Sequence, residues 1–99
     1  MSLRKLKQLF GFNEKKKRIK ELEKKIKELY PKLQDESISD DELLYLLKIC
    51  DEYLKLVDEM FGGRVDYVWK YTLVSLIKLS AYLEKSKREF RRKVLGIST

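Results

Sequence analysis

In the middle of the chain, apolar side chains recur at alternating steps of four and three residues, and this spacing constrains the fold more than any other feature. They are Leu43, Leu47, Cys50, Leu54, Val57 and Phe61. This spacing is typical of one face of an amphipathic helix. Ser39, with Glu42 three positions later, predicts a capping box at the start of the helix. Gly62-Gly63 predicts its end, because glycine adopts the left-handed C-cap conformation without strain. The sequence therefore predicts a helix over 39–61.

Apolar positions at helical spacing predict three further helices, at about 2–10, 14–30 and 64–95. The first two are separated at Gly11, where the apolar register slips, and Asn13 can cap the second. Pro31 predicts the end of the second helix, because the residue before a proline disfavours the helical conformation. The alternative is that the first two helices fuse through Gly11. With four Gly and one Pro in 99 residues, the chain is predicted to be an all-α, single-domain bundle of about four helices.

The last predicted helix is apolar around nearly its whole circumference, which is typical of a central helix or of half an oligomer interface. One face holds Val65, Val68, Trp69, Leu73, Leu76, Leu79 and Leu83. We expect this face to lie in the core, with the helix at the centre of the bundle. The second face is the predicted contact of a homodimer and holds Tyr67, Tyr71, Val74 and Tyr82.

Charge is divided along the sequence. Residues 1–33 carry 12 basic and 4 acidic side chains, residues 34–66 carry 3 and 10, and residues 67–99 carry 8 and 2. The arrangement that neutralises most of this charge within the fold places the acidic third helix between basic neighbours. The net charge of +7 leaves cations for a partner.

The residue inventory excludes several chemistries. The chain has no histidine, which removes the commonest general base and metal ligand, and its one cysteine cannot complete a zinc site. No phosphate-binding glycine loop is present, and the acidic stretch 35–42 lacks the spacing of a calcium loop. Ser75 and Lys78 lie at helical spacing as a conceivable nucleophile and base, but nothing marks an oxyanion site. We expect no enzyme activity, no cofactor and no metal.

A first basic cluster opens the predicted second helix and consists of Lys15, Lys16, Lys17 and Lys20. Farther along this helix, acidic residues lie four positions from lysines and can pair with them. The opening lysines lack such partners and lie where the helix dipole disfavours cations. Because natural chains tend to break a local rule where function requires it, this cluster is a candidate site. Fusion of the first two helices would remove the conflict with the dipole.

A second basic cluster lies near the C-terminus, where the helix dipole favours cations, and consists of Lys85, Arg88, Arg91 and Arg92. Guanidinium groups suit phosphate. If the fold brings the two clusters together, they form a surface for non-specific, salt-sensitive binding of nucleic acid, which is the function we expect. Nothing resembles a recognition helix with base-reading Asn or Gln, so sequence specificity is not expected.

Two alternatives remain. The charges could serve stability and assembly, making the protein a structural or protein-interaction module, homodimeric or not, without a nucleic-acid role. The segment LRKLKQLFGF could instead lie on an anionic membrane, although packing against protein is the commoner fate of such a segment. A transmembrane segment is not expected, since the longest uncharged run of the apolar C-terminal half, 71–77, is far shorter than the ~20 residues needed.

The segments MSLRKLKQLFGF and VDYVWKY, with the Lys/Glu-rich helix between them, resemble the small basic proteins of filamentous viruses of hyperthermophilic archaea, the lipothrixviruses and rudiviruses. The resemblance is one of length, composition and general residue pattern over the whole chain, without a diagnostic motif. It implies a location in the host cytoplasm or the virion and carries no functional residues over. Three Asn and Gln residues in total against 17 Lys also indicate a hot environment. A single cysteine and the lack of a secretory signal fit an intracellular location.

Overall fold

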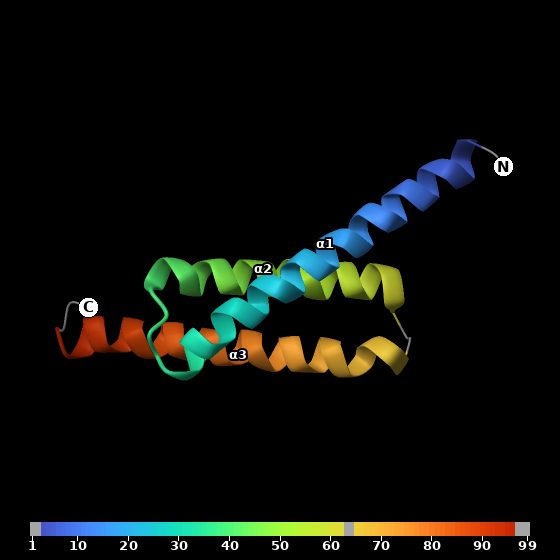
Figure 1. The fold of residues 1–99 in the computed structure, drawn as a ribbon. Helices are drawn as coiled ribbons and strands as arrows, with labels where there is room; N and C mark the ends of the chain where they lie inside the picture. Colours follow the sequence, from blue (N-terminus) through green and yellow to red (C-terminus); the bar gives the residue numbers. More distant parts are fainter. Residues whose placement is uncertain (1–2, 63–64, 97–99) are drawn as a thin grey trace.

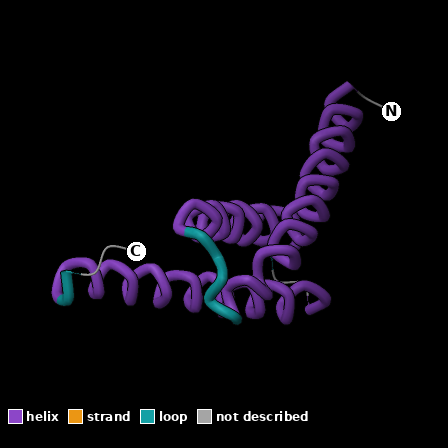
Figure 2. The backbone as a smooth tube through the Cα atoms, turned by 60° about the vertical axis from the view of Figure 1, so that its left-hand side comes forward, coloured by secondary structure: helices purple, strands orange, loops and turns teal. Residues whose placement is uncertain are grey.

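The computed structural model describes residues 3–62 and 65–96, and the prediction of an all-α fold is confirmed for them (Figure 1). They form three helices rather than the predicted four: α1, α2 and α3, with bounds Leu3–Gln34, Asp40–Phe61 and Val65–Val94. Helices α2 and α3 run antiparallel side by side, and α1 crosses them obliquely (Figures 1 and 2). No helix in these ranges is long and apolar enough to cross a membrane.

The predicted break at Gly11 is wrong, because α1 continues through it and the two N-terminal helices are one. A glycine inside a helix costs only about 1 kcal/mol, whereas a break would leave backbone groups unsatisfied on both sides. The register slip has another explanation. The N-terminal part of α1 projects past the end of α2, so its apolar positions need not match the seam that begins at Ile19 (Figure 2). Asn13 is therefore within the helix, and Ser2, the predicted first cap, lies outside the described residues.

Pro31 also fails to end α1, which runs to Gln34 with the proline inside it. The proline removes one backbone donor, but Leu33 in the following turn is 7% exposed and belongs to the core. Burial of this side chain favours one further helical turn. The helix ends where Glu36 adopts a positive φ of 62° and the amide of Ile38 donates to the carbonyl of Lys32.

Both ends of α2 lie where the sequence predicts them. Ser39 Oγ accepts from the amide of Glu42, whose carboxylate accepts from the amide of Ser39, so the capping box is confirmed. Gly62 follows the last turn, but with a φ of −50° rather than the predicted left-handed conformation. A Cβ at Gly62 would lie 2.6 Å from the carbonyl oxygen of Asp58, so close backbone approach is what requires glycine here. Gly63 lies outside the described residues.

The central helix is α2, not α3 as predicted, because α2 packs against both other helices whereas α1 and α3 contact each other only weakly. The core consists mainly of the apolar seam of α2 together with Ile19, Leu22 and Ile26 of α1 and Val74, Ile77 and Ala81 of α3. The molecule is elongated, 63 × 24 × 20 Å, with a radius of gyration of 17.0 Å. A compact domain of this length would have a radius near 13 Å.

Helix α3 turns the opposite face to the core from the one the sequence predicts. Val74 and Tyr67, assigned to a dimer contact, pack inside the chain, while the predicted core residues Trp69, Leu76 and Leu83 are 61%, 56% and 63% exposed. Charge explains the choice, because Lys78 and Arg88 lie on the side of α3 that faces the acidic α2 and pair with carboxylates there. α3 ends before Gly96, whose φ of +63° confirms the predicted stop.

Candidate interaction surfaces

The acidic α2 pairs with cations from both neighbours, as the charge pattern predicts. From α1, Lys15 reaches Glu59 at 3.3 Å, Lys32 reaches Glu42 at 2.7 Å, and Nε and Nη2 of Arg18 donate to the two oxygens of Glu52. From α3, Lys78 pairs with Asp51, and Arg88 and Arg92 both pair with Asp40. Much of the positive charge therefore joins the three helices to one another.

The C-terminal basic cluster is largely occupied by this pairing. The guanidinium of Arg88 donates to Asp40, to Glu84 and to the carbonyl of Ile38, and its side chain is only 14% exposed. Arg92 shares Asp40, and Lys85 lies 3.8 Å from Glu89. Of the four predicted residues, only Arg91 has no ion pair within the described part of the chain. This cluster therefore acts as a clamp, in the sense that its ion pairs hold the end of α3 to the start of α2, and little of it is left to bind a partner.

The two basic clusters do not form one surface. Lys15 lies against Glu59 near the end of α2, and Arg88 lies against Asp40 at its start. These partners are nineteen positions apart along α2, which corresponds to about 28 Å. Figure 1 shows the same separation, with residues 85–93 at the far end of α3 from the point where α1 leaves the bundle. The expected combined surface is therefore absent.

What remains is a face of α1 made of lysines. Lys16, Lys17 and Lys20 from the predicted cluster are exposed and form no ion pair with any described residue. Because α1 is continuous, they lie in the middle of a helix and the predicted conflict with the dipole does not arise. At about 100° per residue, two further exposed lysines fall on the same side of α1 as these three: Lys24 and Lys27.

Lys24 and Lys27 were missed because acidic neighbours four positions away predict local pairs. Neither local pair forms in the structure. Glu23, expected to pair with Lys27, instead accepts from the hydroxyl of Tyr53 at 2.8 Å and from Lys70 at 3.3 Å. Glu28, four positions after Lys24, is exposed and forms no ion pair with a described residue. Contacts with the other two helices, which single-helix spacing does not reveal, therefore account for Lys27, whereas Lys24 is free because the expected pair with Glu28 does not form.

The exposed face of α3 is the second surface. It consists of Val68, Trp69, Leu73, Leu76, Leu79, Leu83, Phe90 and Val94, each between 46% and 63% exposed. Part of it borders a groove of about 190 Å³ between α1 and α3, lined by Ile26, Tyr30 and Trp69 among others. Scattered single apolar residues are normal on a surface, but a continuous row along one helix marks a contact site.

The four residues predicted for a dimer contact are divided by the structure. Val74 is 6% exposed inside the chain, and Tyr67 stacks on Phe61 with ring centroids 3.9 Å apart, so neither presents its main apolar surface to a partner. Tyr71 and Tyr82 are 41% and 52% exposed. Half of the predicted face is thus an internal contact, and the other half is exposed.

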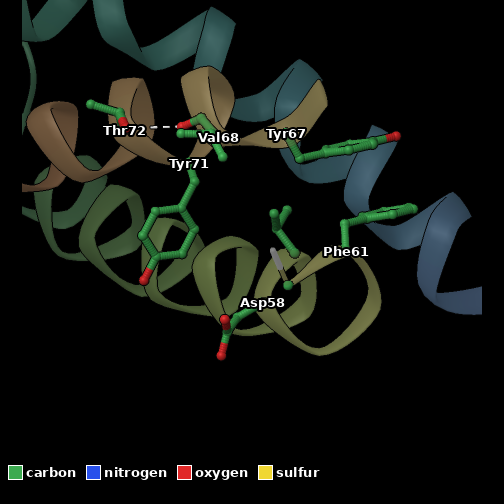
Figure 3. Close-up of a pocket in the computed structure, with 8 residues that line it drawn as sticks. Asp58, Phe61, Tyr67, Val68, Tyr71 and Thr72 are labelled. Atoms are coloured by element: carbon green, nitrogen blue, oxygen red, sulfur yellow. Dashed lines mark hydrogen bonds between the residues drawn. The ribbon is translucent and has the colours of Figure 1, made fainter. Parts of the chain in front are cut away.

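A small hollow of about 170 Å³ lies at the junction of α2 and α3, beside the stacked rings of Phe61 and Tyr67 (Figure 3). The carboxylate of Asp58 points away from these rings, and Thr72 donates to the carbonyl of Val68 at 2.9 Å. The hollow therefore offers few polar groups to a ligand. The Ser75 hydroxyl donates to the carbonyl of Tyr71 at 2.8 Å while Lys78 pairs with Asp51, so these side chains do not form the conceivable nucleophile pair.

The fold and surfaces define a class: an elongated three-helix protein with an apolar core bordered by ion pairs between the helices, a lysine face on α1 and an apolar face on α3. No protein-family model matches the chain, and no curated protein or solved structure is significantly similar to it. The resemblance to proteins of archaeal filamentous viruses stays a prediction. Function must therefore be argued from the two surfaces.

Proposed function

We propose that this protein is a non-enzymatic binding protein whose α1 lysine face holds the phosphate backbone of nucleic acid without sequence preference. The observation that carries the proposal is the set of five exposed lysines on one side of α1 that have no ion pair within the described chain: Lys16, Lys17, Lys20, Lys24 and Lys27.

The geometry suits a linear polyanion. From Lys16 to Lys27 the helix rises about 16 Å, a length over which duplex DNA carries roughly nine phosphate charges. The two acidic residues between Lys16 and Lys27 lie off the stripe, because Glu21 pairs with Arg18 and Glu23 turns toward Tyr53 and Lys70. Lysines act as point charges, so they contact phosphates of any sequence.

The test is fluorescence anisotropy of a labelled 30-base-pair duplex, titrated with the full chain at several salt concentrations. We expect affinity to fall steeply with salt. The triple variant Lys16→Gln, Lys20→Gln, Lys24→Gln should bind more weakly, and the slope of log affinity against log salt should shrink by about three, since about one phosphate contact is lost per lysine.

A matched control removes the same charge elsewhere. Lys48, Lys55 and Lys93 are exposed and form no ion pair with the described residues, so the triple Gln variant at these positions has the same net charge as the test variant. This control variant should keep most of the slope of log affinity against log salt that the native chain shows. Absence of binding at low salt, or equal loss in both variants, would contradict the proposal.

A second candidate function is that of a protein-assembly module, and the apolar face of α3 is the observation that favours it. Under this reading the cations chiefly stabilise the fold, as the pairs of Lys15, Arg18 and Arg88 already do. The two functions use different helices and are compatible in one molecule.

A further inference from the structure

The row of apolar side chains on α3 is about half exposed along its length, although Trp69 and Leu73 border the groove with α1 and Lys70 lies 5.8 Å from the Trp69 ring. Taking residue 76 as the centre and 100° per residue, residues 69, 73, 76 and 83 lie within about 60° of one line along the helix. Between residues 68 and 83 the exposed side of α3 bears no charged residue. Beyond it, Lys87 occupies a position on the same line, but its ammonium group is drawn to Glu36 at 2.8 Å and Glu84 at 3.1 Å.

We propose that this face binds a second copy of the chain, with the two α3 helices antiparallel and crossing at Leu76. The inference does not depend on nucleic-acid binding, which uses α1. It also differs from a dimer through the tyrosine face, because Tyr67 and Val74 already serve the interior.

The amount of apolar surface supports an interface of this kind. The six side chains of the row between Val68 and Leu83 are about half exposed and together offer on the order of 500 Å² of apolar surface. Phe90 and Val94 would lie opposite positions 62 and 58 of the other copy, outside its α3, and are not counted. The largest apolar patch of an ordinary monomer covers about 300–600 Å². Each partner of a stable complex buries about 800 Å². The row therefore lies in the upper part of the range for a free surface and supplies more than half of the area that each partner of a dimer buries.

The spacing of the row fits helix-to-helix packing. Trp69, Leu73, Leu76 and Leu83 recur at steps of four, three and seven, the spacing of a coiled-coil seam. With Leu76 of each copy at the crossing point, Trp69 of one copy lies opposite Leu83 of the other. The larger aromatic ring then meets an aliphatic side chain at both ends of the contact.

Charge selects the antiparallel orientation. Residues 84–93 carry six basic and two acidic side chains, whereas residues 51–66 carry two basic and five acidic ones. Because α2 and α3 are antiparallel neighbours, the acidic end of α2 lies beside the start of α3 (Figure 1). An antiparallel dimer places each basic end near the acidic end of the other copy. A parallel dimer would place two basic ends together, which disfavours it.

The first test is sedimentation equilibrium of the full chain at low to high micromolar concentration. We expect a mass twice that of one chain. Leu76→Glu and Leu76→Lys should each give monomers, because like charges would meet at the crossing point, and an equimolar mixture of the two should recover the dimer. Leu76 is 56% exposed, so both variants should keep the helical circular dichroism of the native chain.

Tyr71→Glu is the matched control, since Tyr71 is 41% exposed on the other side of α3 and should leave the dimer intact. Disulfide formation tests orientation in chains that also carry Cys50→Ala. A chain with Trp69→Cys should cross-link to one with Leu83→Cys, and neither should cross-link to itself. A monomer at every concentration, dissociation by Tyr71→Glu but not by Leu76→Glu, or self-linking of the Leu83→Cys chain would each overturn the proposal.

Discussion

The hydroxyl of Tyr53 donates a 2.8 Å hydrogen bond to Oε1 of Glu23, and this pair lies at the junction of all three helices. Tyr53, on α2, is 1% exposed, and Glu23, on α1, also receives the ammonium of Lys70 from α3 at 3.3 Å. Burial, and after it the hydrogen bond to Glu23, raises the pKa of Tyr53. One carboxylate thus links α1 to both other helices.

Replacing Tyr53 with Phe tests the value of this junction. The ring would still fill the core, but the partly buried carboxylate of Glu23 would lose a donor, and we expect the free energy of unfolding to fall by about 1–2 kcal/mol. Urea denaturation measures it. Tyr45→Phe is the control, because Tyr45 is 39% exposed and has no hydrogen bond within the described chain. Equal losses of unfolding free energy in the two variants would show that the hydrogen bond from Tyr53 to Glu23 does not stabilise the fold.

Arg88 should be the most important cation of the C-terminal cluster. Its guanidinium donates to two carboxylates and one carbonyl while its side chain is 14% exposed, so Arg88→Met leaves Asp40 and Glu84 short of partners. We expect a loss of about 2 kcal/mol in the free energy of unfolding. The neighbouring exposed Arg91, replaced in the same way, should cost less than about 0.5 kcal/mol. A reversed order in thermal unfolding would show that the clamp is not formed.

The ends of α2 could be predicted because they depend on local chemistry. The Ser39–Glu42 capping box requires only four consecutive residues, and the apolar seam of α2 follows directly from spacing. The orientation of α3 could not be predicted, because its two apolar faces are equally plausible by spacing alone. The choice depends on where Lys78 and Arg88 meet Asp51 and Asp40, which is a relationship between helices.

The candidate lysine site shows the same limit. Sequence spacing identified Lys16, Lys17 and Lys20 but assigned them to the start of a separate helix, whereas α1 is continuous. Spacing does not show whether a helix continues through Gly11, because a glycine inside a helix costs only about 1 kcal/mol. It excluded Lys27 because Glu23 is four residues away, whereas tertiary contacts take Glu23 to Tyr53. Local rules locate charge well but do not decide which charges stay free.

Two glycines should respond to alanine in opposite directions. At Gly11 a Cβ would meet nothing within 4 Å, so Gly11→Ala should stabilise the continuous helix by roughly 0.5–1 kcal/mol and raise helicity by circular dichroism. At Gly62 the Cβ would lie 2.6 Å from the carbonyl oxygen of Asp58, so Gly62→Ala should lower the free energy of unfolding by about 1–3 kcal/mol. If Gly11→Ala instead lowers helicity, α1 does not pass straight through this position.

Acid should weaken the α1–α2 junction. The ammonium of Lys32 and the amide of Ser39 lower the pKa of Glu42 from 4.5 to about 2. A group whose pKa is lowered by folding contributes stability above its unfolded value, and that contribution disappears as the pH falls from about 4.5 to 2. Glu42→Gln keeps the shape of the cap but removes the charge, so its melting temperature should lie below that of the native chain at pH 7 and converge with it near pH 2.

Glu28→Gln is the control for this pH series, because Glu28 is exposed and has no ion pair within the described chain. Its melting curve should follow the native one at every pH. A Glu42→Gln chain that stays below the native chain by the same amount at pH 2 would show that the charge of Glu42 is not the cause.

The thiol of Cys50 should react only when the protein opens. Cys50 is 0% exposed, and burial raises its pKa from 9.0 to about 12, so at pH 8 the thiolate fraction is lower by a factor of about 1000. Reaction with Ellman's reagent should therefore follow the rate of unfolding and accelerate with urea. A chain with Ser86→Cys, exposed on α3, should react at that site at once. Immediate labelling of the native chain would mean that α2 packs against its neighbours more loosely than the buried seam requires, since a neighbouring helix must separate from α2 for the reagent to reach Cys50.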